Sequence, residues 1–229
     1  MMHAIEAFAI ANEKRQARHR YGVNSVFGPT IQGEGPEAGV VCIFVRFSGC
    51  NMWDGRPETK AESNCPYCDT DFFSHDMLTC DAIMDRIKAL DNGVEWIWLS
   101  GGEPLLQVDE WLIRRLHREG YKVAVETNGT VKPRPGVKVD LLTVSPKLPP
   151  QFLKIKKADS LKVLYPHPNP SIHPSAFDEL KASWRYVQPV EIEDDPDATK
   201  RNIDATVQFA LAHPAWRVGI QMHKMIGVA

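Results

Sequence analysis

Short apolar runs recur along the chain at positions that predict β-strands. Residues 40–47, VVCIFVRF, form a continuous β-branched and aromatic run between two glycines, which is typical of a strand buried on both faces. Similar runs predict strands over residues 95–100, 122–127, 141–145, 160–164, 184–188 and 217–222. The buried character of these runs favours a parallel sheet.

Between these strands, three segments carry apolar residues at helical spacing. They are residues 81–90 with Ile83, Ile87 and Leu90, residues 108–119 with Leu112 and Leu116, and residues 199–213 with Ile203, Val207 and Leu211. Strands that alternate with helices predict an α/β fold with a parallel sheet. Polar motifs (SGCN, SGGEP, ETNG, SPK, QPV and MHK) begin where apolar runs end. Since parallel folds bind ligands at the carboxyl ends of their strands, these motifs predict a site there.

Composition narrows the class of protein. The 229 residues contain no linker or repeat, so we expect one domain. Lys and Arg number 27 and Asp and Glu 29, a balance that argues against nucleic-acid or anionic-membrane partners. No apolar run reaches the roughly 18 residues of a membrane span, and the N-terminus does not look like a signal peptide. We therefore expect a cytoplasmic protein with reduced cysteines.

Three of the five cysteines are spaced like metal ligands. Cys50 is followed by 14 residues and then by Cys65 and Cys68. Three thiolates leave one ligand position open, which suits an iron–sulfur cluster with one free iron. The alternative is a structural Cys₃His zinc site completed by His75. Cys42 and Cys80 have apolar or helical surroundings and are interpreted as structural.

Several polar residues have both a binding and an ordinary structural interpretation. Gly101 and Gly102 would let the backbone approach a ligand, or simply form a tight turn. Glu126 ends a strand and is able to accept hydrogen bonds from ribose hydroxyls. The segment Gln32–Gly35 suits the mixed donors and acceptors of a purine- or pterin-like edge, or is a surface turn. Arg46 ends a predicted strand and needs an anion unless that end is hydrated.

The order of these motifs resembles the radical S-adenosylmethionine (SAM) superfamily, and the Cys-x14-Cys-x2-Cys loop resembles the 7-carboxy-7-deazaguanine synthase family. The resemblance runs from Thr30 to Lys224 and includes RFSGCN, VSPK and QMHK. It implies a partial, open parallel (β/α) barrel of about six strands, the radical SAM core. Residues 23–229 would form this domain, and residues 1–22 an N-terminal extension.

The resemblance also implies cofactors and their ligands. Cys50, Cys65 and Cys68 would hold a [4Fe–4S] cluster whose fourth iron binds SAM, and Thr70 would bind Mg²⁺. The residues implied to contact SAM are Gly101, Gly102, Glu103, Glu126, Asn128, Ser145 and Lys147. The residues implied to contact the substrate are Ile31, Gln32, Gly33, Glu34, Arg46, Gln188, His223 and the C-terminal Ala229.

The implied reaction is the ring contraction of 6-carboxy-5,6,7,8-tetrahydropterin to 7-carboxy-7-deazaguanine with loss of ammonia, a step of 7-deazapurine and queuosine biosynthesis. Such an enzyme needs a reductant protein such as flavodoxin or ferredoxin, and family members are often homodimers. Two other functions stay open at this point. One is a glycyl-radical-activating enzyme, which shares a similar cluster and SAM site, and the other is a non-enzymatic zinc-binding module.

Overall fold

The chain is built around a nine-stranded sheet, as seen in a computed structural model that describes residues 18–192 and 194–228. The sheet order is β3-β1-β2-β4-β5-β6-β7-β8-β9, and β2 and β4 to β9 run parallel. The strands are β1 (Tyr21–Ile31), β2 (Val41–Phe47), β3 (Asp76–Leu78), β4 (Trp96–Gly101), β5 (Lys122–Thr127), β6 (Leu141–Val144), β7 (Lys157–Tyr165), β8 (Lys181–Pro189) and β9 (Arg217–Val218). The prediction of a parallel α/β fold is confirmed.

The last predicted strand is shorter than its apolar run. Residues 217–222 were expected to be extended, but β9 ends at Val218 and the helix α5 (Met222–Ile226) begins at the last of these residues. The amide of Met222 donates to the carbonyl of Gly33, 2.9 Å away. A tertiary contact with a distant loop therefore accompanies the change from strand to helix.

The pattern of apolar residues does not predict β1, which runs antiparallel to β2 and whose pairing has two register shifts. Gly22, Gly28 and Pro29 interrupt its apolar pattern and look like turn residues. Its last residue, Ile31, pairs with Val41, the first residue of β2. The segment that follows β1 therefore starts at the end of the sheet opposite to the carboxyl ends of the parallel strands.

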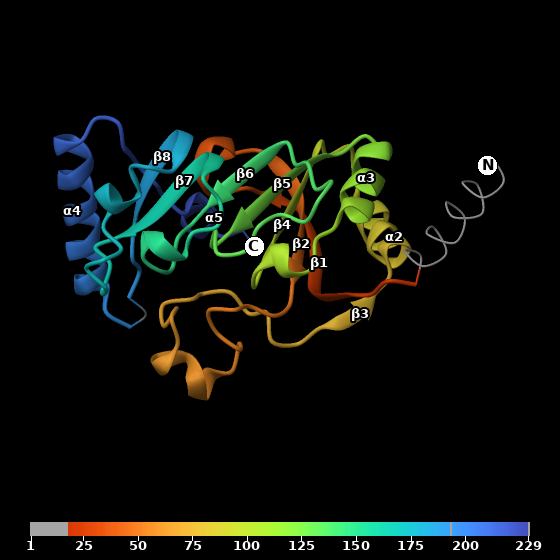
Figure 1. Cartoon of the computed structure of the whole chain (residues 1–229), viewed down its shortest axis with the longest axis horizontal. Coiled ribbons are helices and arrows are strands. Elements are labelled where there is room, and N and C mark those ends of the chain that lie inside the picture. Colours follow the sequence, from red (N-terminus) through yellow and green to blue (C-terminus); the bar gives the residue numbers. More distant parts are fainter. Residues whose placement is uncertain (1–17, 193, 229) are drawn as a thin grey trace.

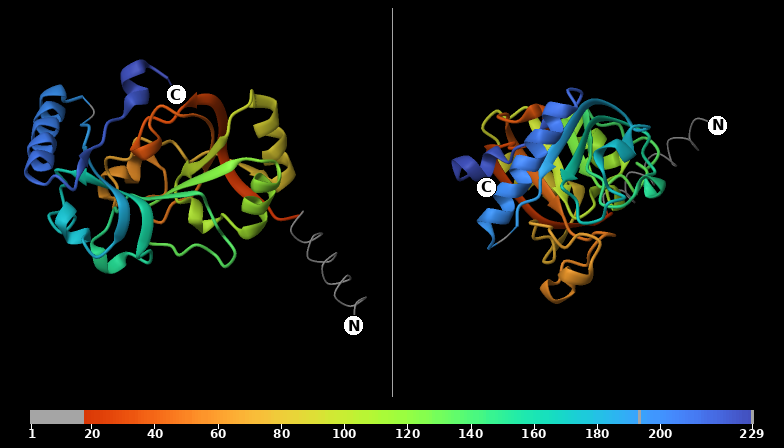
Figure 2. Two further views of the ribbon diagram at one scale, coloured as in Figure 1. Left: turned by 90° about the horizontal axis from the view of Figure 1, so that it is seen from above. Right: turned by 90° about the vertical axis from the view of Figure 1, so that its left-hand side faces the viewer.

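The sheet curves into a partial, open barrel (Figure 2). Residues of β2 alternate between its two faces, with Ile43 and Val45 in the main core beside the helices. Cys42 and Phe44 belong instead to a second apolar cluster, together with Trp98 of β4. Arg46 is on the same face of β2 as this second cluster, and this face lines the cavity described below.

Two helices pack as their periodicity predicts. The helices α2 (Cys80–Leu90) and α3 (Glu110–Arg118) lie at one end of the sheet, and α4 (Pro196–Ala212) lies at the other (Figure 1). The predicted residues Ile83, Ile87, Leu112 and Leu116 of α2 and α3 are all buried.

The predicted packing face of α4 is wrong. Ile203 and Leu211 are 39% and 71% exposed, whereas Thr206 and Phe209 are buried. The hydroxyl of Thr206 donates to the carbonyl of Tyr165 in β7 at 2.8 Å. The helix therefore packs through a hydrogen-bonded threonine and an aromatic ring, a combination that an apolar pattern does not reveal.

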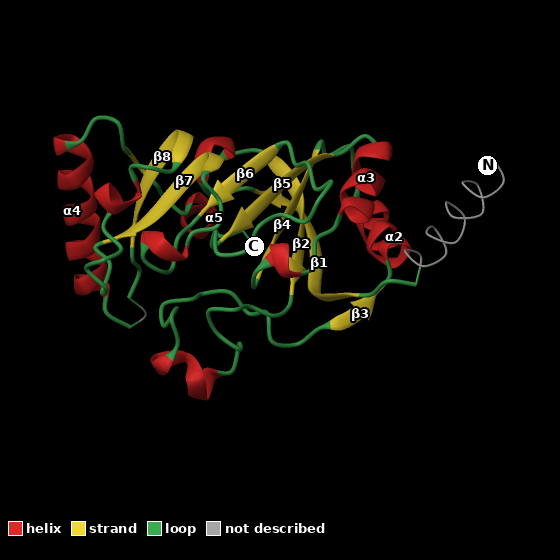
Figure 3. Cartoon of the chain, in the orientation of Figure 1, coloured by secondary structure: helices red, strands yellow, loops and turns green. Residues whose placement is uncertain are grey.

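A long loop, residues 48–75, joins β2 to β3 and projects from the sheet (Figure 1). Its only helical element is the short 3₁₀ helix η2 (Pro57–Glu62) (Figure 3). The chain also forms 3₁₀ helices η1 (Gly35–Glu37), η3 (Pro104–Leu106), η4 (Pro150–Phe152) and η5 (Pro174–Phe177). Within the described ranges, no helix has the length and apolar character needed to cross a membrane.

We expect Ile97→Ala in β4 to destabilise the protein by about 2–5 kcal/mol, because it removes a fully buried side chain and leaves a cavity. The matched control is Ile203→Ala on the exposed face of α4, which should cost less than about 0.5 kcal/mol. Urea unfolding of both variants measures the difference. Equal losses at the two positions would contradict the packing described for α4.

Candidate active site

A cavity of about 930 Å³ opens along the concave face of the sheet, a volume typical of ligand sites. Almost all of the predicted site residues line it: Ile31, Gln32, Gly33, Glu34, Arg46, Cys50, Cys65, Cys68, Thr70, Gly101, Gly102, Glu126, Asn128, Ser145, Lys147, Gln188 and His223. Glu103 lies behind the cavity wall, and Ala229 falls outside the described residues. Residues far apart in the sequence thus meet at one site.

The three clustered cysteines line the cavity from the loop 48–75. A hydrogen bond between the thiols of Cys65 and Cys68 lowers the pKa of Cys68 and, together with burial, raises the pKa of Cys65. Burial also raises the pKa of Cys50, whose sulfur accepts the amide of Met52 at 3.4 Å. Cys42 and Cys80 are buried, Cys42 inside the sheet and Cys80 in the main core.

His75, the proposed fourth zinc ligand, is not part of this site. It is exposed, and its Nδ1 lies 3.3 Å from the carbonyl of Phe73. Among residues 18–192 and 194–228, no three His, Cys, Asp or Glu side chains converge to hold a single ion. Three soft thiols along the wall of an open cavity instead fit a larger iron–sulfur cluster that keeps one iron available to a ligand.

Gly101 and Gly102 line the cavity, and close packing within the protein also requires glycine at both positions. A Cβ at Gly102 would lie 2.1 Å from the carbonyl oxygen of Gly49, and a Cβ at Gly101 would lie 2.2 Å from that of Phe47. The amide of Gly102 donates to the carbonyl of Phe47 and the amide of Glu103 to the carbonyl of Gly49, each at 2.9 Å. The paired glycines therefore let this loop pack against the backbone next to Cys50.

Glu103 ties two site loops together. Its fully buried carboxylate accepts hydrogen bonds from the amide of Leu105 at 3.0 Å, the hydroxyl of Thr127 at 2.8 Å and the amide of Asn128 at 2.7 Å. Burial raises the pKa of Glu103, and these bonds oppose that effect. The predicted contact of Glu103 with SAM stays a prediction, since its side chain is engaged within the protein.

Asn128 continues this connection to the cysteine loop. Its Nδ2 donates to Oδ1 of Asn51 at 2.9 Å, and Nδ2 of Asn51 donates to the hydroxyl of Thr130 at 2.7 Å. Asn51 is the residue after Cys50. The loops that follow β2, β4 and β5 are therefore joined by an unbroken set of hydrogen bonds, which fixes the relative positions of Cys50, Gly102 and Asn128.

A network of charges lies deeper in the cavity and includes a residue that sequence reasoning missed. The ammonium of Lys162 in β7 forms ion pairs with the carboxylates of Glu34 and Glu126. The amides of Gln188 and Gln221 donate to Oε1 of Glu34 at 3.1 and 2.8 Å. A lysine in the middle of the apolar run SLKVL was the available signal, because a buried charge requires a partner.

Arg46 has no such partner. Its Nε is buried without a hydrogen bond in the described part of the chain, and its guanidinium lies 5.0 Å from the centre of the Phe27 ring. Burial lowers the pKa of Arg46, whereas the charges of Asp71 and Asp69 raise it. Oε1 of Gln188 is likewise buried without a partner. These two groups leave a cation and an acceptor at the cavity available to a ligand.

The remaining predicted residues form two smaller contacts. Nζ of Lys147 donates to Oγ of Ser145 at 2.6 Å, and burial lowers the pKa of this lysine. His223 packs so closely on the loop after β1 that a Cβ at Gly33 would lie 2.0 Å from its Nδ1. Gly33 is therefore needed to let α5 approach the cavity.

Comparisons with known proteins show which family, relatives and fold this chain is similar to. The model of the Radical SAM superfamily matches residues 61–161, a range that contains Cys65, Cys68 and the GGEP and ETNG motifs. The 7-carboxy-7-deazaguanine synthases of Bordetella pertussis and Bradyrhizobium diazoefficiens are each 37% identical to this chain over 217 residues, which is 91% of this chain and 99% of each relative. The crystal structure of QueE from Escherichia coli has the same fold, with a TM-score of 0.65 at 23% identity and coverage of 93% of this chain and 98% of that one.

We expect Gly102→Ala to destabilise the protein by about 1–3 kcal/mol, because the added methyl group collides with the carbonyl of Gly49 and displaces the cysteine loop. The matched control is Gly93→Ala, where φ is +98° and nothing lies within 4 Å of the new Cβ. The control carries only a conformational cost of about 1–2 kcal/mol. Urea unfolding gives both costs, and iron content after anaerobic reconstitution should fall only in Gly102→Ala. Normal iron content in that variant would contradict the role of Gly102.

Proposed function

The chain belongs to the 7-carboxy-7-deazaguanine synthase family of radical SAM enzymes, and from this premise we propose how its cavity converts 6-carboxy-5,6,7,8-tetrahydropterin to 7-carboxy-7-deazaguanine with loss of ammonia. The observation that carries the proposal is that Nε of the half-buried Arg46 is buried without a hydrogen bond to the described residues, in a cavity that also contains Glu34 and its hydrogen-bond donors. A substrate with one carboxylate and a ring edge of N–H donors complements both groups. Membership of this family argues against the two alternative functions, a zinc-binding module and a glycyl-radical-activating enzyme.

The cofactors of the family are a [4Fe–4S] cluster and SAM, and Cys50, Cys65 and Cys68 would hold the cluster. When the cluster and SAM are bound, these cofactors would supply the reductive cleavage of SAM and the abstraction of a hydrogen atom from the substrate. Glu103 holds the backbone of Asn128 in place by the contact described above. The residues on the SAM side would be Gly101, Gly102, Glu103, Glu126, Asn128, Ser145 and Lys147.

On the substrate side, the protein binds and orients the pterin. Arg46 takes the carboxylate, and a planar guanidinium fixes its orientation through two parallel hydrogen bonds. Glu34, whose pKa is lowered by Lys162 against the effect of burial, presents an ionised carboxylate to ring N–H groups. Ile31, Gln32, Gly33, Gln188 and His223 would line the remaining edge. The predicted contact of the Ala229 carboxylate lies outside the described residues.

Mg²⁺ would bind at Thr70, on the same side of the cavity as Arg46. Thr70 lies between Asp69 and Asp71, and all three residues line the cavity. Asp69 is already paired with Lys224 at 2.8 Å, so Thr70 and the substrate carboxylate are the better ligands. Magnesium keeps several waters and needs few protein oxygens, so this site requires no acidic cluster. The ion would orient the carboxylate of the substrate.

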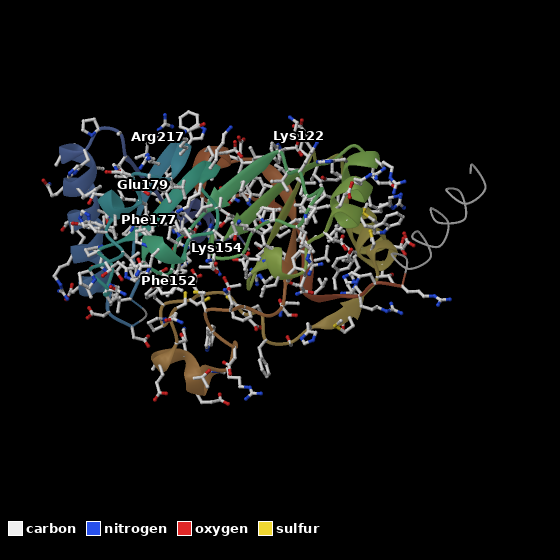
Figure 4. The ribbon with its side chains drawn as sticks, in the orientation of Figure 1. Lys122, Phe152, Lys154, Phe177, Glu179 and Arg217 are labelled. Carbon is white, nitrogen blue, oxygen red and sulfur yellow. The ribbon has the colours of Figure 1, made fainter. Side chains whose placement is uncertain are left out.

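The remaining proposals concern partners and organisation. A reductant such as flavodoxin or ferredoxin would approach beside the cysteine loop, and Phe152 and Lys154, labelled in Figure 4, are exposed side chains that it could contact. The amide of Lys154 donates to the carbonyl of Gly129 at 2.8 Å, next to the hydrogen bonds that reach Asn51. We also propose a cytoplasmic homodimer with no nucleic-acid or membrane partner. Residues 23–229 would form its radical SAM domain and residues 1–22 an extension, although β1 already begins at Tyr21.

We expect anaerobically reconstituted protein, given SAM, a strong reductant, Mg²⁺ and 6-carboxy-5,6,7,8-tetrahydropterin, to form 7-carboxy-7-deazaguanine detectable by mass spectrometry. Cys50→Ala, Cys65→Ala and Cys68→Ala should each abolish both product and 5′-deoxyadenosine, because each removes a cluster ligand. Cys42→Ala is the matched control and should keep the cluster. Formation of 5′-deoxyadenosine without product in the unmodified protein would overturn the proposed substrate.

We expect Arg46→Met to weaken pterin binding about 10- to 100-fold, the loss typical of a charge-assisted hydrogen bond. Cleavage of SAM in the absence of the pterin should be largely retained, because Arg46 would contact only the substrate. Chromatography of 5′-deoxyadenosine and calorimetric titration of the pterin measure the two effects. Loss of both activities together would instead give Arg46 a structural role.

A further inference from the structure

Lys162 occupies an unusual position for a lysine. It lies in the middle of β7, where its neighbours Leu161 and Val163 are fully buried on the opposite face. The side chain of Lys162 is only 8% exposed and lines the cavity. A charge this deep is costly unless its environment compensates it, so its partners are informative.

Those partners come from the two sides of the cavity. Glu34 follows β1 and belongs to the proposed pterin side, whereas Glu126 is the next-to-last residue of β5 and belongs to the proposed SAM side. The ammonium forms an ion pair with Oε2 of Glu34 and a second one, at 3.1 Å, with Oε2 of Glu126. One side chain therefore bridges the two carboxylates.

Uncharged donors fix the same two carboxylates from other directions. Gln188 and Gln221 donate to Glu34, as described above. The indole of Trp98 donates to Oε1 of Glu126 at 3.2 Å, and Nε2 of Gln32 donates to the same atom at 3.3 Å. Each carboxylate is thus held in one orientation, and Lys162 is the cation common to both.

The charges of Lys162, Glu34 and Glu126 indicate that their ion pairs serve ligand binding as well as folding. Within the trio, one ammonium faces two carboxylates, so the group keeps a net negative charge in a largely buried place. A buried ion pair contributes little net stability compared with apolar residues. Both carboxylates also line the cavity, where donors of a ligand would complete their hydrogen bonding. Burial lowers the pKa of Lys162, but the charges of Glu126 and Glu34 raise it by more than burial lowers it. The lysine therefore stays protonated.

We propose that Lys162 is a positioning residue that holds Glu34 and Glu126 together. It thereby fixes the position of the pterin subsite relative to the SAM subsite. The proposal rests on the function proposed above, because that function assigns the two carboxylates to different ligands. Lys162 touches neither ligand in this scheme and acts through the two carboxylates. Loss of the Lys162 ammonium should therefore weaken the binding of both ligands, of the pterin through Glu34 and of SAM through Glu126.

The test is calorimetric titration of 6-carboxy-5,6,7,8-tetrahydropterin and of SAM into the anaerobically reconstituted protein. Lys162→Met keeps the apolar stem and removes the ammonium. We expect it to weaken each ligand about 10- to 100-fold, as loss of charge-assisted hydrogen bonds does. The matched control is Lys157→Met, the same substitution at an exposed position of β7, which should bind both ligands as the unmodified protein does.

Double-variant cycles distinguish positioning from a merely structural role. If Lys162 acts through Glu34, Lys162→Met should weaken pterin binding much less in a Glu34→Gln background than alone. The same comparison with Glu126→Gln should hold for SAM. Lys162→Met should also raise the amount of 5′-deoxyadenosine formed per product, because SAM and the pterin are no longer aligned. Additive losses, or binding within twofold of the unmodified protein, would overturn the proposal.

Two further outcomes are decided by the same measurements. Should Lys162→Met fail to fold, Lys162→Met/Glu126→Gln removes one charge of each sign and is compared with Glu126→Gln. The double variant should bind the pterin at least about tenfold more weakly than the single one, and equal binding would overturn the proposal. If the unmodified protein binds SAM but not the pterin, the proposed substrate is wrong, and the bridge between two ligand subsites is wrong with it.

Discussion

Buried charge is the constraint on which the arrangement of this site depends. The concave face of the sheet carries Arg46 and Lys162, and neither can be removed from water without an anion. Lys162 forms ion pairs with two carboxylates of the protein, whereas Arg46 forms no ion pair with the described residues and its Nε is buried without a hydrogen bond. The cavity therefore contains one cation that is ion-paired within the protein and one that is not. This asymmetry predicts where an anionic ligand belongs, and it agrees with the carboxylate of the substrate.

A second requirement is that loops from separate strands keep fixed relative positions. Gly102 allows one loop to pack on the backbone of Gly49, and the buried carboxylate of Glu103 connects that loop to Asn128. The carboxylate of Glu103 is fully buried, so water does not compete for its hydrogen bonds. The cysteine loop itself has little regular structure, so its position at Cys50 depends on these hydrogen bonds and close backbone contacts. Preorganisation of this kind is what a reaction with a reactive intermediate needs from its protein.

One wall of the cavity is formed by a segment that enters from the opposite end of the sheet. Because β1 is antiparallel to its neighbour, the segment Gln32–Glu34 enters from the end of the sheet opposite to the cysteine loop. Gly33 then allows α5 and His223 to pack on this segment. The residues proposed to bind the pterin and those proposed to hold the cluster thus reach the cavity from its two ends, and Lys162 of β7 contacts Glu34 of the first group. An open barrel offers this arrangement because both ends of its interior are accessible to loops.

The sequence by itself determined the parallel strands and the packing of α2 and α3, and most of the site residues that it predicted line the cavity. The strands and helices depend on local periodicity, which is a property of contiguous residues, and the site residues follow from the resemblance of their motifs to a known family. Tertiary structure alone decided the packing face of α4, where Thr206 bonds to a distant carbonyl, and the pairing of β1 despite its turn-like residues. It also decided that Gly102 serves protein packing and that Lys162 bridges Glu34 and Glu126. These features rest on contacts between residues far apart in the chain, and no local pattern encodes the partner of a buried charge.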